Sequence, residues 1–268
     1  MILRLISILI IQSSLFVMLS AETVDSDNIR NNAFNENERL MFLIRWGVIR
    51  GGFATLEVDS RKKHNNRDCF LILSRVRSNG FFDTFYKVRD VNTSLIDADN
   101  FCVYEFEKHQ REGSFSRDRK VEFLYDKNKI LIHKGTEIEE QPLDRDFLQD
   151  VLSALYYLRT KDISLETKHE IEVFDGKKKW MLEVDVLKRE TVQVPAGNFK
   201  CFKLKPKLKG EGIFKSKGDL YVWVTTDSMH LPVKLRAKIP VGSITGELIT
   251  THVDEVNKFF TKDDFYKY

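Results

Sequence analysis

Most apolar segments of this chain alternate with a period of two residues, and this pattern constrains the fold more than any other feature of the sequence. Successive side chains of a β-strand point to opposite faces of a sheet, so such alternation is typical of strands with one buried face. We expect about eleven strands in a largely antiparallel sheet. The clearest candidates are the segments 41–46, 69–76, 81–91, 101–110, 114–125, 130–133, 179–192, 199–207 and 231–239.

One segment at 143–160, LDRDFLQDVLSALYYLRT, departs from this pattern because its apolar residues recur at helical spacing. Its apolar stripe consists of Phe147, Val151, Leu155 and Leu158, widened by Leu148 and Leu152, and its polar side consists of Gln149, Asp150 and Ser153. Asp144 suits the N-terminal end of such a helix and Arg159 suits the C-terminal end. We therefore expect a mainly β fold: a strongly curved antiparallel sheet, an open or half barrel, with one main α-helix at 144–159 packed in its concave face.

The beginning of the chain has the features of a secretory signal peptide. Arg4 is the only charged residue in 1–21, an apolar run covers 5–19, and Ser20 and Ala21 are small residues suited to cleavage. The run is short and interrupted by polar residues, which favours cleavage over a membrane anchor. The end of this run has no cysteine to which a bacterial lipid anchor could be attached. No later segment has the ~20 apolar residues of a membrane span.

These features predict a periplasmic or secreted protein with a simple organisation. We expect a signal peptide at 1–21, a flexible lead-in at 22–37, a single β-rich domain at 38–256 and a C-terminal tail at 257–268. Cleavage would leave 42 Lys and Arg residues against 40 Asp and Glu residues, a balance that gives no reason to expect a nucleic-acid partner. The sequence predicts no transmembrane span after cleavage and leaves the oligomeric state open.

The three cysteines, Cys69, Cys102 and Cys201, are an odd number for an oxidising compartment. Two arrangements fit: three isolated, partly buried cysteines, which we favour, or a disulfide between Cys69 and Cys102 with one thiol left over. The six histidines are scattered without metal-ligand spacing, and the sequence has neither a nucleophile-elbow motif nor a phosphate-binding glycine loop. We therefore predict no catalytic residue, metal site or cofactor. A hydrolase or lyase acting on polysaccharide has only the abundant carboxylates in its favour.

Basic residues occupy every second position in two segments of the last third of the chain. Tyr221 and Trp223 should lie between these segments on the same outward side, where cations and aromatic rings attract each other. The predicted anion-binding face consists of Lys203, Lys205, Lys207, Tyr221, Trp223, Lys234, Arg236 and Lys238. One interpretation is an interaction module that docks an anionic glycan or an acidic partner. The favoured alternative is a solvated sheet face on which Glu183 and Asp185 neutralise the lysines.

Large aromatic side chains are concentrated in two neighbouring segments, 81–86 and 101–106. A sheet that curls around a helix without closing leaves a cavity that such side chains can line, although ordinary core packing is the alternative. Our main functional hypothesis is a non-catalytic binding protein for an apolar or amphiphilic cell-envelope molecule, with lipid among the candidate ligands. The predicted lining consists of Trp46, Phe82, Phe85, Phe106, Leu152, Leu155 and Tyr156.

Six segments, taken in order, resemble the bacterial exported family of unknown function called DUF3108. They are RWGVIRGGFATLEV (45–58), SNGFFDTFYKVRD (78–90), QDVLSALYYLRT (149–160), VFDGKKKW (173–180), VPAGNFKCFKLKP (194–206) and GDLYVWVTTDSMHLPVKLRAKIPVGSITGEL (218–248). The resemblance covers 39–253. It implies an envelope protein with an open β-barrel and a helix against it, a shape similar to the LolA and LolB lipoprotein carriers. It implies no catalytic residues.

Overall fold

The computed structural model describes residues 31–208 and 219–252, so the predicted signal peptide and C-terminal tail lie outside the described residues. The strands are β1 (Arg39–Trp46), β2 (Ile49–His64), β3 (Arg67–Ser78), β4 (Arg89–Asp97), β5 (Val103–Glu112), β6 (Phe115–Leu124), β7 (Lys129–Lys134), β8 (Glu137–Pro142), β9 (Lys168–Phe174), β10 (Lys179–Val194), β11 (Gly197–Leu208), β12 (Leu220–Thr225), β13 (Pro232–Lys238) and β14 (Ser243–Thr250). The helices in the same residues are α2 (Gly80–Asp83) and α3 (Val151–Arg159), and a 3₁₀ turn covers Tyr125–Lys127.

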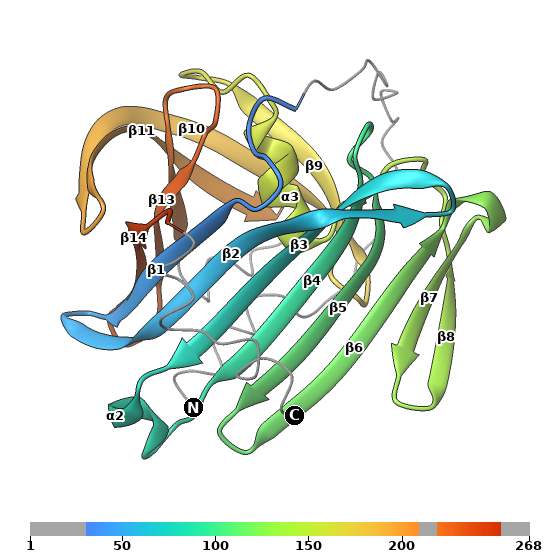
Figure 1. Ribbon diagram of the computed structural model, residues 1–268, viewed down its shortest axis with the longest axis horizontal. Helices are drawn as coiled ribbons and strands as arrows, with labels where there is room; N and C mark the ends of the chain where they lie inside the picture. Colours follow the sequence, from blue (N-terminus) through green and yellow to red (C-terminus); the bar gives the residue numbers. More distant parts are fainter. Residues whose placement is uncertain (1–30, 209–218, 253–268) are drawn as a thin grey trace.

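All these strands form one antiparallel sheet in the order β8-β7-β6-β5-β4-β3-β2-β1-β14-β13-β12-β11-β10-β9. Sequence neighbours pair throughout, except at the centre, where β1 pairs with β14 (Figure 1). β8 and β9 are the two edges, so the sheet is open, and it is not strongly curled. The prediction of a mainly β, antiparallel fold is confirmed, whereas the predicted strong curvature and the predicted number of about eleven strands are wrong. One reason is that the largely polar segment 137–142 pairs with β7 across a turn in which Gly135 has φ 65°.

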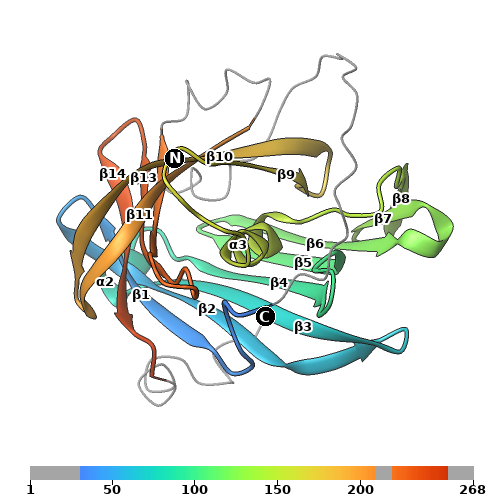
Figure 2. The same ribbon diagram turned by 90° about the horizontal axis from the view of Figure 1, so that it is seen from above.

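α3 lies between the two halves of the sheet. It contacts β3 and β4 on one side and β9 on the other, and Figure 2 shows it between β9 and β10 and the strands β3 to β6. The largest hydrophobic cluster includes residues of β3 to β7, of α3 and of β9 to β11. We call the sheet face that carries these residues the inner face and the opposite one the outer face.

The helix begins later than its periodicity predicted, at Val151 instead of 144. Asp150 is the N-cap, and its side chain accepts hydrogen bonds from the amides of Leu152 and Ser153. The preceding residue, Gln149, is held in an extended bridge with β9: its amide donates to the Glu172 carbonyl over 3.0 Å, and its carbonyl accepts from the Phe174 amide over 2.8 Å. Because its backbone groups are already paired with β9, the helix cannot extend back through Gln149.

The helix also buries a different face from the one its apolar stripe predicted. Gln149, Asp150 and Ser153, expected on the solvent side, are buried, whereas Val151 is 50% exposed. The polar groups are accommodated by specific hydrogen bonds, such as the one over 2.6 Å from the Gln149 side chain to the Phe101 carbonyl. A helix that contacts strands on two sides buries more than one stripe, so the stripe alone could not identify the buried face.

Arg159, at the last turn of α3, ties the helix to the N-terminal segment. Its guanidinium forms two hydrogen bonds with the Glu38 carboxylate, over 2.7 and 2.8 Å, and donates to the Ala33 and Met229 carbonyls over 2.7 and 3.1 Å. It also lies over the rings of Phe34 and Tyr156. Ala33 and Phe34 are buried in the core, so the described end of the predicted flexible lead-in is packed.

The segment 81–91, predicted as one strand, instead contains α2 followed by a loop and then β4. The Asn79 side chain accepts a hydrogen bond from the Phe82 amide over 3.0 Å and caps the helix. Asp83 then binds Arg89 and the Ser78 hydroxyl, which fixes the return of the chain into β4. Phe82 is consequently buried, whereas Phe81 and Phe85 face solvent.

The three cysteines are all buried and not disulfide-bonded, which is the arrangement favoured from the sequence. Burial, assisted by the nearby charge of Asp97, raises the pKa of Cys69 to about 11 and that of Cys102 to about 12. Burial also raises the pKa of Cys201 to about 12, so these thiols are protonated and unreactive at neutral pH.

Candidate functional site

A cavity of about 440 Å³ lies between α3 and the inner face of the sheet. Its helical side consists of Val151, Ala154, Leu155 and Leu158. The opposite wall is drawn from the strands of both halves and includes Phe42, Ile44, Leu56, Val76, Leu182, Val184, Leu204, Val222 and Leu235. Almost all the lining side chains are apolar, and the volume falls within the roughly 300–1,000 Å³ of small-molecule sites. Val151 is thus exposed toward a cavity, which accounts for an apolar residue on the open side of the helix.

Toward one side of the cavity the inner face becomes polar. Residues directly opposite each other in antiparallel strands share a face, so the pairing register defines a row that crosses five strands. The row consists of Leu56, Ser74, Asn92, Lys108 and Arg119, on β2 to β6 in turn. Leu56 and Ser74 line the cavity, so the two cations lie on the same face of the sheet as the cavity wall.

Lys108 and Arg119 have no carboxylate within ion-pair distance in residues 31–208 and 219–252; Arg119 donates instead to the Gly176 carbonyl over 2.9 Å. Burial lowers the pKa of Lys108, and the more distant carboxylates of Asp90, Glu112 and Asp175 oppose that shift. Asp175 lines the cavity and acts electrostatically on both cations. The inner face beside the cavity wall therefore carries two cations without a close carboxylate partner in the described residues.

Glu112 lies further along the same face of β5. Burial, together with the neighbouring carboxylate of Asp90, raises the pKa of Glu112 well above its usual range. Asp90 accepts a hydrogen bond over 2.8 Å from the Arg111 amide. A raised pKa lowers the fraction of Glu112 that is charged at neutral pH, so Glu112 offsets the positive charge of Lys108 less than an ordinary carboxylate would.

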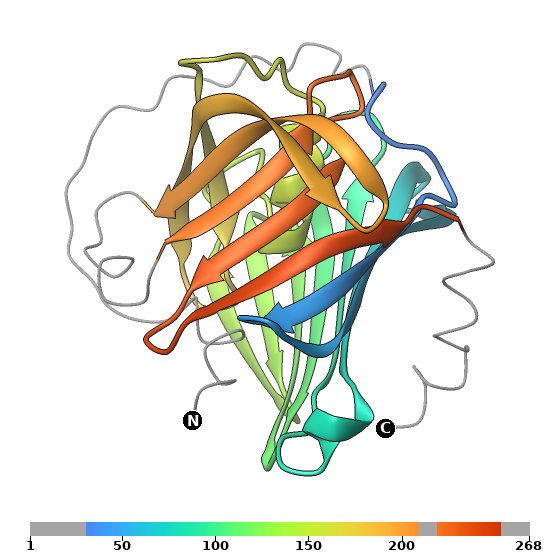
Figure 3. The ribbon, with the colours of Figure 1, turned by 90° about the vertical axis from the view of Figure 1, so that its left-hand side faces the viewer.

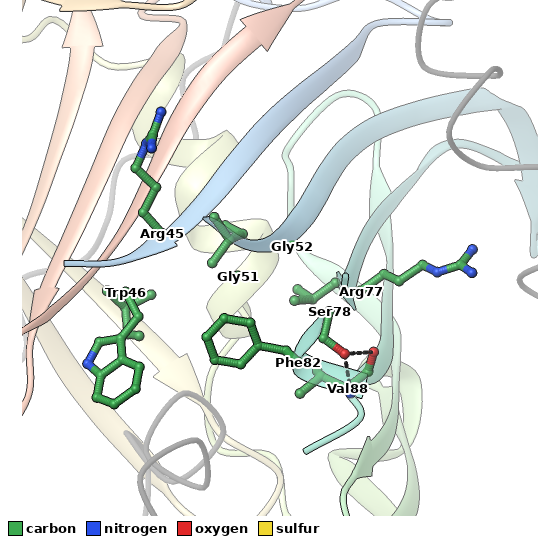
Figure 4. Close-up of a pocket in the computed structure, with 11 residues that line it drawn as sticks. Arg45, Trp46, Gly51, Gly52, Arg77, Ser78, Phe82 and Val88 are labelled. Atoms are coloured by element: carbon green, nitrogen blue, oxygen red, sulfur yellow. Dashed lines mark hydrogen bonds between the residues drawn. The ribbon is translucent and has the colours of Figure 1, made fainter. Parts of the chain in front are cut away.

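A second, much smaller pocket of about 40 Å³ lies at the end of the sheet near α2. Figure 4 shows the ring of Phe82 pointing toward Trp46, with Gly51 beside it, while the Ser78 hydroxyl is bonded to the backbone of Val88. Its volume suits about one water molecule, not an organic ligand. Three of its lining residues, Ile44, Val76 and Ile244, also line the large cavity, so the two share a wall.

The seven predicted lining residues are distributed over several environments. Leu155 lines the large cavity, and Trp46 and Phe82 line the small pocket. Phe106 and Tyr156 are buried in the hydrophobic core, and Leu152 packs against it. Phe85 is exposed.

The predicted basic face lies on the outer side of β11 to β13, and acidic neighbours bind most of its cations. Lys205 pairs with Asp219 over 2.8 Å, Lys234 with Glu247 over 2.8 Å, Lys238 with Asp219 over 3.8 Å, and Lys207 with Asp185. Lys203 lies 4.2 Å from the centre of the Tyr221 ring, and Arg236 is paired with Tyr221 in the sheet register. Trp223 is buried and donates to Glu190 over 2.8 Å. Anion docking on this face would have to compete with these ion pairs.

Nothing in the sequence pattern indicated that Lys108 and Arg119 lie near the cavity. They belong to β5 and β6, in which most residues near them are polar, so alternation does not reveal which side faces the cavity. Only the register across β2 to β6 places them on the inner face. Within the described ranges no group of three or more His, Cys, Asp or Glu side chains is arranged to hold a metal ion. The same residues contain no helix that is both long and apolar enough to cross a membrane.

Comparison with known proteins identifies a family and a fold. The family described as "Protein of unknown function (DUF3108)" matches residues 41–249. The crystal structure of a β-barrel-like protein of the domain of unknown function DUF1849 from Brucella abortus is similar, with a TM-score of 0.54 and 11% sequence identity over 80% of this chain and 96% of that chain. A protein from Bacteroides fragilis with a YmcC-like fold has a TM-score of 0.30 and 11% identity over 80% and 95% of the two chains. No curated protein matches the sequence.

Proposed function

The protein belongs to the DUF3108 family of unknown function, and for this member we propose that the cavity beneath α3 binds the apolar chain of an amphiphilic molecule without chemical conversion. The observation that carries this proposal is an apolar cavity of about 440 Å³ between α3 and the sheet. Protein interiors are normally close-packed, and an unfilled apolar space of this size is costly. Occupation by an apolar ligand would recover the lost contacts.

The polar row on the inner face favours an amphiphilic ligand over a pure hydrocarbon. An acyl chain in the cavity would place its polar end toward Lys108 and Arg119, which have no close carboxylate partners in the described residues. An anionic group such as a carboxylate would complement these two cations.

A role in the cell envelope is part of this proposal. It draws on the signal-like sequence of 1–21, because an exported protein meets amphiphiles at membranes. Loading of such a molecule between α3 and the sheet would resemble the action of LolA-type carriers, and we offer that likeness as an analogy of fold.

Filling the cavity is expected to abolish binding. Leu155→Trp adds a large ring to a half-buried position in the lining, so a fluorescent fatty acid that palmitate displaces from the wild-type protein should bind the variant at least roughly tenfold more weakly. Leu187→Trp, at an exposed position of β10, is the matched control and should bind as the wild type does. Equal binding by all three proteins would exclude the cavity, and circular dichroism would identify a variant that has failed to fold. Mass spectrometry of organic extracts of the purified protein would identify any molecule retained from the cell.

Neutralising Lys108 tests the charged end separately. Lys108→Met is expected to weaken palmitate binding by roughly tenfold or more because a charge-assisted contact is lost, while binding of hexadecanol stays unchanged. The control is Lys168→Met, at an exposed lysine of β9. If Lys108→Met bound palmitate like the wild type, Lys108 would have no part in the site, and the cavity itself would be unaffected as a candidate.

A further inference from the structure

Exposed apolar side chains are concentrated at one end of the sheet, where the β1–β2 hairpin, α2 and the β13–β14 turn lie. We call this set the apolar rim; it consists of Val48, Ile49, Phe81, Phe85 and Val241. Val48 is 90% exposed, Phe81 64% and Phe85 60%. The rim contains five of the eleven large apolar residues that are exposed in residues 31–208 and 219–252. Scattered exposed apolar residues are normal, whereas a cluster marks an interaction site.

Hydrogen bonds hold the three turns of the rim together. The Trp46 indole donates to the Val241 carbonyl over 2.9 Å, which joins the β1–β2 hairpin to the β13–β14 turn. Asn79, the cap of α2, donates from its side chain to the Arg50 carbonyl over 2.7 Å and so joins α2 to the same hairpin. Figure 3 shows α2 projecting from this end of the molecule. The apolar side chains are therefore presented together by a fixed framework.

The exposed rings also form a packed group. The ring centres of Phe81 and Phe85 lie 5.3 Å apart, and each ring contacts Phe82, which is buried. Phe82 lines the small pocket directly behind the rim. Two exposed phenylalanines anchored by a third can enter an apolar medium without rearrangement of the backbone.

The rim is continuous with the large cavity. The small pocket behind Phe82 shares Ile44, Val76 and Ile244 with that cavity. Leu208 and Leu220, which also line the cavity, end β11 and begin β12 at the same end of the sheet as the β13–β14 turn. Apolar surface thus runs from the exposed rim to the cavity wall.

The charge around the rim is positive. Arg50 and Lys87 are exposed beside it, and neither pairs with a carboxylate in the part of the chain that the structure describes. The one carboxylate of α2, Asp83, is bound by Arg89 over 2.5 and 3.1 Å. An apolar cluster flanked by unpaired cations complements a surface that offers acyl chains beneath phosphate groups.

We propose that the apolar rim docks the protein onto a lipid bilayer that contains anionic lipids. Phe81, Phe85 and Val48 enter the boundary between headgroups and acyl chains, and Arg50 and Lys87 face the lipid phosphates. This proposal goes beyond ligand binding and stands on the exposed residues alone, so it does not require the cavity to be occupied. It also gives an apolar ligand a route between membrane and cavity that avoids water.

Flotation of the purified protein with lipid vesicles tests the proposal. The wild-type protein should bind vesicles that mix phosphatidylcholine with phosphatidylglycerol, and the double variant Phe81→Ser with Phe85→Ser should bind at least roughly tenfold more weakly. Leu165→Ser with Leu187→Ser removes two apolar residues away from the rim that are 51% and 46% exposed, and it should bind like the wild type. The control variant should unfold at the wild-type midpoint because its substituted residues are exposed. The rim variant should unfold at a slightly lower midpoint because its rings no longer contact Phe82.

Charge reversal separates the two contributions. Arg50→Glu with Lys87→Glu should lose most of its preference for the anionic vesicles over vesicles of phosphatidylcholine alone. The proposal would be overturned if the wild-type protein bound neither kind of vesicle. It would also be overturned if the rim variant and the control variant bound the anionic vesicles equally. A third result would also overturn it: a wild-type protein that is dimeric and binds no vesicles, together with a Phe81→Ser, Phe85→Ser variant that is monomeric. The rim would then be covered by a second copy of the chain.

Discussion

Arg159→Ala is expected to lower the free energy of unfolding by roughly 3–5 kcal/mol, because it leaves the Glu38 carboxylate without its charged partner in a largely buried site. Only 1% of Arg159 is exposed. Its guanidinium holds Glu38 in two hydrogen bonds and also binds the carbonyls of Ala33 and Met229. The variant therefore disconnects α3 from two other segments at once. Unfolding in urea, followed by circular dichroism, measures the change.

Two further variants show whether the lost ion pair is the cause. Arg189→Ala removes an exposed arginine with one long hydrogen bond of 3.4 Å to Thr226, and should change stability by no more than roughly 0.5 kcal/mol. Arg159→Met combined with Glu38→Leu replaces both charges and should recover part of the stability lost in Arg159→Ala. An Arg159→Ala protein as stable as Arg189→Ala would mean that the ion pair contributes little.

The antiparallel β architecture could be predicted from alternation, since a strand with one buried face repeats every two residues whatever its neighbours are. The single segment with helical spacing was also identified correctly as the site of the main helix. Its start was not, because Gln149 uses its backbone hydrogen bonds to bridge β9, which lies at the far edge of the sheet. The bridge joins Gln149 to Val173, and the residues around Gln149 show no pattern that would indicate such a distant contact.

The cavity could be anticipated but most of its lining could not. Aromatic residues in 81–86 suggested a lining, yet Asn79 caps a short helix there and turns Phe81 and Phe85 outward. The observed lining comes mainly from aliphatic side chains on the central strands and α3. These residues look like ordinary core residues in the sequence, and only the distance between α3 and the sheet makes them a cavity wall.

The site and the rim together suggest a single orientation for the molecule. The strand ends that carry the rim are those at which the cavity residues Leu208 and Leu220 lie. Docking by the rim would therefore bring the cavity to the bilayer, so the two proposals reinforce each other while resting on different residues. The basic outer face of β11 to β13 would remain in water, where its ion pairs are formed.

Gly52→Ala is expected to destabilise the protein by at least roughly 3 kcal/mol, at the upper end of the cost of overpacking, because the clash is with backbone. A Cβ at this position would lie 2.1 Å from the Arg77 carbonyl oxygen and 2.8 Å from the Ser78 Cα. Gly52, near the start of β2, pairs with Ser78 at the end of β3, just before Asn79 caps α2. Relief of the clash would move β3 away from β2 and with it the helix that carries Phe81. We therefore expect weaker vesicle binding as well as a lower unfolding midpoint.

The neighbouring Gly51 supplies a matched control, because it differs from Gly52 in the room available for a Cβ atom. A Cβ there would meet the Ile44 carbonyl oxygen at 3.6 Å and the Phe82 ring at 3.8 Å, both ordinary contacts. Gly51→Ala also reduces the freedom of the unfolded chain, so its stability should stay within roughly 1 kcal/mol of the wild type. Because both variants add the same methyl group to the same strand, a large difference between them can come only from the close approach of β3 to Gly52. Equal stability of the two variants would show that β2 and β3 are not held this close in solution.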